Sequence, residues 1–219
     1  VIRFTMRTLG VKRLMFGFDE MHGFNRDSRS RAQGRSNAES LAYAINKLQG
    51  AMATEDPTAR AMVWADMLCP FHNGGRPQYQ QYSGGIAGAT WHAASLLDKR
   101  VIVVPWWYSG YDTAEWPVNC SEPNLSKGCT DPGTDCGNVR CAMDNQPTYW
   151  GSRGMDWLAA GVTKADNLAT WSRLQKGHAN ALGVMTTQWS SPPSTAGIPF
   201  AGEYGWNQAQ TQRTANCAT

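Results

Sequence analysis

Short apolar runs recur along this chain, most of them ending at an acidic or aromatic residue, and helical patterns lie between them. The runs occupy residues 13–18, 61–65, 100–105, 154–160 and 181–188. The first ends in Asp19 and Glu20, the second in Asp66, and the third in Trp106-Trp107-Tyr108. Strands that alternate with helices pair in parallel and keep their functional residues at their carboxyl ends. The pattern therefore predicts an α/β fold with a site assembled from strand ends.

The segments between the runs carry helix signals. Ser36 and Glu39 form a capping box, in which each side chain satisfies a free backbone N–H of the other. A second helix is expected near 87–97, and a third over 163–176 with Thr163 as its N-cap. Five such strand–helix units are the repeat of a (β/α)8 barrel or of a nucleotide-binding sheet.

Glycine-rich phosphate-binding motifs separate these two folds. Neither Gly-x-Gly-x-x-Gly nor Gly-x4-Gly-Lys-Ser/Thr occurs in the sequence, so a nucleotide cofactor has no support and none is expected. The barrel is favoured, although five strands cannot close one. We therefore expect 1–219 to supply about the last five β/α units of a barrel, with the missing half preceding Val1 or belonging to a larger assembly.

Cysteines and glycosylation sequons gather in a loop predicted at about 112–148. The loop contains Cys120, Cys129, Cys136 and Cys141, and the sequons begin at Asn119 and Asn124. An even number of cysteines in such a loop favours disulfides, and sequons mark surface loops of secreted proteins. Zinc is the weaker interpretation because the loop has no Cys-x-x-Cys pair and no His. An extracellular location is expected; the pairing of Cys69 and Cys217 stays open.

Composition excludes two classes of partner. A net charge of +3 is too small to indicate nucleic acid. No apolar run approaches the roughly 20 residues that a membrane helix needs. Ten tryptophans are many for 219 residues, and such rings are common in cores and in sugar-binding clefts.

The segment Gly17-Phe18-Asp19-Glu20 after a strand resembles the Asp-Glu signature of family-20 glycoside hydrolases, the β-N-acetylhexosaminidase-like barrels. This resemblance implies that Glu20 protonates the leaving glycosidic oxygen and that Asp19 orients the 2-acetamido group of the substrate, which attacks the anomeric carbon. It also implies a glycan substrate and a sugar site walled by aromatic residues. Candidates for that wall are Trp64, Trp106, Trp107, Tyr108 and Trp189.

The sequence departs from the family pattern at several positions. Ser190 and Ser191 replace an acid that often follows the last-strand tryptophan, and the seventh-strand acid has no match unless Asp156 serves. These gaps keep a second hypothesis open: an inactive extracellular domain on the same barrel, which binds carbohydrate or builds a cell coat or filament. A disulfide-stabilised binding module unrelated to barrels does not explain the recurring acids and aromatic residues.

Other candidate residues have two interpretations each. Asp66 is either a second carboxylate of the site, as a nucleophile or a base, or a strand-end acid that bonds loop backbone. His72 and His22 are substrate contacts or structural histidines. The cluster of Arg26, Arg29 and Arg31 binds acidic polysaccharide groups or is a solvated loop.

Overall fold

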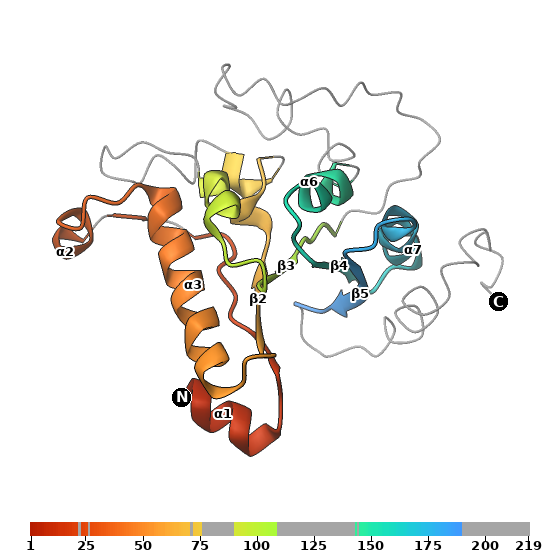
Figure 1. The fold of residues 1–219 in the computed structure, drawn as a ribbon. Coiled ribbons are helices and arrows are strands. Elements are labelled where there is room, and N and C mark those ends of the chain that lie inside the picture. Colours follow the sequence, from red (N-terminus) through yellow and green to blue (C-terminus); the bar gives the residue numbers. More distant parts are fainter. Residues whose placement is uncertain are drawn as a thin grey trace.

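The computed structural model describes residues 1–21, 23–25, 27–70, 72–75, 90–108, 143 and 145–189, which form an α/β arrangement (Figure 1). Five parallel strands make one curled sheet in the order β1-β2-β3-β4-β5. The strands are β1 (Arg13–Met15), β2 (Arg60–Trp64), β3 (Ile102–Val104), β4 (Trp157–Val162) and β5 (Ala181–Thr187). The predicted α/β class and parallel pairing are confirmed.

Helices join successive strands. The α-helices are α1 (Ile2–Leu9), α2 (Ser28–Arg31), α3 (Asn37–Glu55), α6 (Gln146–Ser152) and α7 (Ala165–Gln175). The described residues also form the 3-10 helices η1 (Asp66–Leu68), η2 (Asn73–Gly75) and η3 (Thr90–Leu96). Helix α3 packs against β2 and η3, and α7 packs against β4 and β5. Within the described ranges, every helix is too short or too polar to cross a bilayer.

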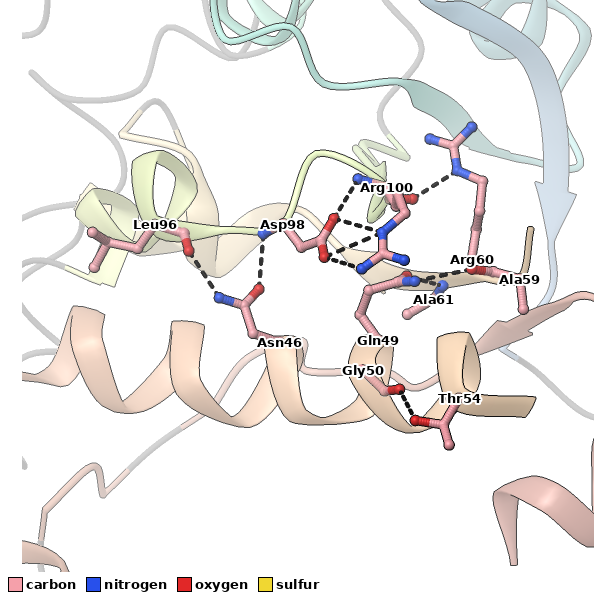
Figure 2. Close-up of polar contacts among 10 residues, drawn as sticks. All are labelled: Asn46, Gln49, Gly50, Thr54, Ala59, Arg60, Ala61, Leu96, Asp98 and Arg100. Atoms are coloured by element: carbon pink, nitrogen blue, oxygen red, sulfur yellow. Dashed lines mark hydrogen bonds and ion pairs between the residues drawn. The ribbon is translucent and has the colours of Figure 1, made fainter. Parts of the chain in front are cut away.

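Helix α3 begins as the sequence predicts, at the capping box of Ser36 and Glu39. Its side chains then bond the neighbouring elements (Figure 2). The Gln49 amide, fully buried, donates to the Ala59 carbonyl at 2.9 Å and accepts from the Ala61 N–H at 2.8 Å. Asn46 donates to the Leu96 carbonyl at 2.8 Å. Because buried amides need such partners, these hydrogen bonds fix the position of α3 along β2.

The two faces of the sheet bury different clusters. Val63, Val103 and Ala159 belong to the main core, which also contains residues of α3, η3, α6 and α7. The alternate positions Trp64, Val104 and Ala160 pack together in a separate cluster. Successive strand residues point to opposite faces. The second cluster therefore lies on the other face of the sheet, the face that leads to the residues at the carboxyl ends of the strands.

Strand β1 differs from the prediction. A buried strand was expected over 13–18, but β1 covers three residues and is partly exposed, because it pairs only with β2 in the described sheet. Beyond it, backbone bonds still follow β2: Phe16 N–H donates to the Met62 carbonyl at 3.0 Å, and Trp64 N–H donates to the Gly17 carbonyl at 2.9 Å. The apolar run thus accompanies β2 as far as Gly17 without remaining a regular strand.

Three further boundaries were predicted wrongly. Helix α6 lies partly inside the segment assigned to the cysteine loop, where Pro147 in its first turn favours a helix start. Helix α7 begins after Lys164 rather than after Thr163, and its N-cap has no side-chain bond. The helix expected near 87–97 is described from Thr90 as 3-10 structure.

Candidate functional site

The carboxyl ends of the strands bring the predicted site residues to one edge of the sheet. Asp19 and Glu20 follow β1, and Asp66 follows β2. The aromatic segment 106–108 follows β3, and Trp189 follows β5. The Glu20 backbone N–H donates a 2.8 Å hydrogen bond to Asp66 Oδ2, which links the first two groups directly. Four separate segments therefore contribute to this edge, as parallel strands allow.

The turn that carries the two acids has unusual backbone geometry. Gly17, Phe18 and Glu20 have φ angles of 77°, 73° and 46°, in the left-handed region. Such a conformation costs a residue other than glycine roughly 1–2 kcal/mol. Strain of this kind persists where surrounding contacts over-determine it, often at functional sites. Both Asp19 and Glu20 are exposed, so the turn presents its carboxylates to solvent at the sheet edge.

The side chain of Asp66 holds this turn in place. Its carboxylate is fully buried, and Oδ2 accepts two hydrogen bonds of 2.8 Å, from the Glu20 N–H and from Asn73 Nδ2. The interpretation of Asp66 as a strand-end acid that bonds loop backbone therefore agrees with these contacts. Its Oδ1 has no hydrogen-bond partner of normal geometry among the described residues.

Burial raises the pKa of Asp66 to about 6, against the lowering effect of the hydrogen bonds from Glu20 and Asn73 and of the nearby Trp106 side chain. The charge of Asp19 raises the pKa further. The Trp106 N–H makes no bond of normal geometry, although it lies near enough to the carboxylate to lower that pKa. A carboxyl group with a raised pKa beside other acids and aromatic rings is typical of sites that transfer protons.

Asn73 and Gly74 also hold Asp66 in place, and neither can be identified as a site residue from the sequence alone. Asn73 is buried and donates to Asp66. A Cβ on Gly74 would lie 2.5 Å from the Met67 carbonyl oxygen, so only glycine allows the loop to close this tightly. The signal in the sequence is the Asn73-Gly74-Gly75 turn pattern, which predicts a tight turn but not its partner.

Aromatic rings from three strand ends meet beside the acids. Trp106 and Tyr108 stack with centroids 5.0 Å apart. The Trp189 indole N–H donates to the Tyr108 hydroxyl at 2.7 Å, and its ring lies 5.8 Å from Trp64. Trp189 is 63% exposed, so it offers an open aromatic face at the sheet edge. Burial raises the pKa of Tyr108, and the charges of Asp19 and Asp66 add to this effect.

His72 and Trp107 lie behind these rings. The imidazole centroid is 4.4 Å from Trp106 and 4.8 Å from Trp107, and His72 is buried. Asn167 on α7 donates to the Trp107 carbonyl at 2.9 Å and accepts from the Val162 N–H at 3.0 Å. Asn167 thus holds the aromatic segment, a role that its place in a helical pattern does not reveal.

Several candidates lie elsewhere. The suggestion that Asp156 serves as the acid of a later strand is wrong: it precedes β4 at the amino end of the sheet, where it pairs with Arg60 at 2.6 Å. In the arginine cluster, Arg29 pairs with Asp27 at 3.0 Å and Arg31 donates to the Asn25 carbonyl at 3.3 Å.

Other predictions fall outside the described residues. These are His22, Arg26, Asn119, Cys120, Asn124, Cys129, Cys136, Cys141 and Cys217. Cys69 is buried, and its sulfur accepts a hydrogen bond from Gln146 Nε2 at 3.3 Å. The described part of the chain contains no cluster of three or more His, Cys, Asp or Glu side chains that could hold a metal ion. A scan against protein-family models and a search of curated proteins both find no match to this chain.

Proposed function

We propose that this protein is a glycoside hydrolase that acts on glycans containing N-acetylhexosamine. One observation carries the proposal: the Asp19-Glu20 turn is tied to the buried Asp66 by a 2.8 Å hydrogen bond, beside aromatic rings from the ends of β2, β3 and β5. Carboxylates cleave glycosidic bonds, and aromatic faces bind the apolar faces of sugar rings. The sequons and the cysteine-rich loop support secretion as part of the same proposal.

In the proposed reaction, Glu20 donates its proton to the leaving glycosidic oxygen as the bond from that oxygen to the anomeric carbon breaks. The carbonyl oxygen of the substrate's own 2-acetamido group forms the new bond to that carbon, and Asp19 orients the acetamido N–H and stabilises its developing positive charge. Water then attacks the anomeric carbon, the bond from that carbon to the acetamido oxygen breaks to regenerate the 2-acetamido group, and the Glu20 carboxylate accepts the proton from that water. The cycle returns Glu20 to its acid form.

Asp66 takes a positioning role in this proposal. It has no exposed surface, and both hydrogen bonds to its Oδ2 come from the protein, one of them from the Glu20 backbone. A nucleophile must reach the anomeric carbon, which a buried carboxylate in these contacts cannot do. Asp66 instead holds Glu20 in its left-handed conformation, so that the general acid is fixed before the substrate binds.

We further propose that the curled sheet is an arc of a (β/α)8 barrel. The sequential order of its five parallel strands supports this, since strands of such a barrel pair in chain order. The concentration of acids and aromatic residues at the carboxyl edge supports it too, because barrel enzymes keep their sites there.

The experiment is hydrolysis of chromogenic N-acetylglucosaminide and N-acetylgalactosaminide by the wild type and by Glu20→Gln. We expect the variant to lose turnover by a factor of about 10² or more while still binding the substrate. Asp66→Asn is expected to keep more turnover than Asp66→Ala, because an amide oxygen can still accept from the Glu20 N–H. Equal kcat for Asp66→Ala and the wild type would refute the positioning role.

A non-catalytic carbohydrate-binding domain is the second candidate. The exposure of Trp189 favours it, because an open aromatic surface binds sugars without any chemistry. Binding of glycans that is abolished by Trp189→Ala, together with no turnover by the wild type on either glycoside, would establish this function instead.

A further inference from the structure

A pocket of about 350 Å³ lies next to the Asp19-Glu20 turn, with Phe18 and Met21 among its lining residues. Phe18, Met21, Phe24 and Leu41 contribute its apolar wall, and its polar lining includes Ser30 and Gln33. This volume falls in the range of roughly 300–1,000 Å³ that small-molecule sites occupy. An apolar wall with a few polar groups suits a sugar ring, which has both apolar faces and hydroxyl groups.

Arg35 sets the charge of this pocket. Among the described residues that line it, Arg35 is the one with a charged side chain. Its guanidinium lies 3.8 Å above the Tyr43 ring, and its Nη1 donates to Gln33 Oε1. No described carboxylate forms an ion pair with Arg35, although hydrogen bonds from Ser36 and, more weakly, the charge of Arg35 lower the pKa of Glu39. The neighbouring Arg29 is paired with Asp27. The stacked guanidinium therefore keeps Nε and Nη2 for a planar anion, which arginine binds with two parallel hydrogen bonds.

The pocket shares a wall with the proposed catalytic turn. Phe18 and Met21, which line it, stand directly before and after Asp19 and Glu20 in the sequence. Phe18 and Glu20, on either side of Asp19, have left-handed φ angles of 73° and 46°. A glycan held at the two carboxylates can thus extend across the turn and place its next unit in the pocket.

From this geometry we infer that the pocket is a subsite for an acidic sugar unit, with Arg35 binding its carboxylate or sulfate group. The inference rests on the proposed function for the identity of the ligand as a glycan. It adds a specificity that the Asp-Glu turn does not supply: the preferred substrate carries an anionic sugar next to the N-acetylhexosamine.

The test measures binding by isothermal titration calorimetry with full-length Glu20→Gln protein, so that no probe is cleaved. Three tetrasaccharides of equal length are compared: one of N-acetylglucosamine alone, one that alternates it with glucuronate, and one of 6-sulfated N-acetylglucosamine. We expect at least one acidic probe to bind about tenfold tighter than the neutral one, as a charged hydrogen-bonded pair predicts. The stronger acidic probe identifies whether carboxylate or sulfate is the natural group.

Three added substitutions locate the effect. Arg35→Gln should reduce the acidic probe to the affinity of the neutral one, and Arg35→Lys should recover only part of the loss, because lysine cannot form the planar pair. Arg29→Gln removes the same charge from the neighbouring helix α2 and should not change the affinity of any probe. Equal affinity for all probes, or equal loss from Arg29→Gln and Arg35→Gln, would overturn the subsite.

Failure of the subsite and failure of the proposed function are separable. If the wild type hydrolyses N-acetylhexosaminides but Arg35→Gln leaves the binding of acidic probes unchanged, the subsite is refuted and the function stands. If Arg35-dependent binding is found without turnover by the wild type, the pocket is an acidic-glycan site of a non-catalytic protein.

Discussion

Asp66→Asn is the substitution whose effect can be worked out most fully from the structure. The carboxyl group of Asp66 has no exposed surface, and burial raises its pKa from 3.8 to about 6. The unfolded chain exposes the same group to water, where its pKa returns to the ordinary value. Between these two values the native protein binds a proton that the unfolded protein has released.

This difference gives the sign and size of a pH effect. Because the native state binds more protons, the free energy of unfolding falls as the pH rises through the window. The stabilising contribution of Asp66 is fully present below about pH 4 and is lost once the pH passes about 6. A difference of about two pH units corresponds to roughly 3 kcal/mol.

An asparagine at position 66 has no proton to exchange in this range. Its side-chain oxygen can still accept from the Glu20 N–H and from Asn73 Nδ2, as Asp66 Oδ2 does at 2.8 Å. We therefore expect the variant to gain stability relative to the wild type as the pH rises. The gain should approach roughly 3 kcal/mol between about pH 4 and about pH 7.

Urea unfolding followed by tryptophan fluorescence at several pH values measures this difference directly. The matched control is Asp56→Asn, since a hydrogen bond from Lys12 lowers the pKa of Asp56 to about 2 and that group stays ionised across the window. The control should follow the wild type with a constant offset. A constant offset for Asp66→Asn as well would refute the assignment of a raised pKa to Asp66.

Three other substitutions give sharp expectations. Glu20→Gly relieves the left-handed φ of 46°, so thermal unfolding should show unchanged or higher stability, by up to about 1 kcal/mol, while turnover is lost. Gln49→Leu leaves the Ala59 carbonyl and the Ala61 N–H buried without partners and should cost roughly 2–5 kcal/mol in urea unfolding. Asp156→Asn weakens the half-buried pair with Arg60 and should lower stability by about 1 kcal/mol with kcat unchanged, since the pair lies at the amino end of the sheet.

The α/β class and the parallel pairing of the strands could be predicted from the sequence because they rest on local signals. Each apolar run is short and is followed by a helix or a loop, and four of the five end next to an acid or an aromatic residue. Such units pair in parallel. The capping box of Ser36 and Glu39 is equally local, and α3 begins there. Strand lengths depend on neighbours instead, so β1 is shorter than its apolar run.

The residues that hold the site in place could not be predicted, because their role depends on contacts between segments that are distant in the sequence. Asn73 bonds Asp66 only because Gly74 allows a turn that a Cβ would block. Asn167 reaches the Trp107 carbonyl across a gap of 60 residues in the chain. The placement of Asp156 at the amino end of β4 likewise follows from where that strand begins, which apolar residues alone define poorly.

The two carboxylate oxygens of Asp66 have different roles: Oδ1 gains or loses the proton, and Oδ2 holds the turn. Because Oδ2 already accepts hydrogen bonds from the Glu20 N–H and from Asn73, the proton that the raised pKa retains belongs on Oδ1. Titration then changes the charge beside Asp19 while the hydrogen bond that holds Glu20 persists in both states. The strained turn that carries the proposed general acid is therefore held in place whether Asp66 is ionised or protonated. The stability of the protein and the position of Glu20 thus respond to pH separately.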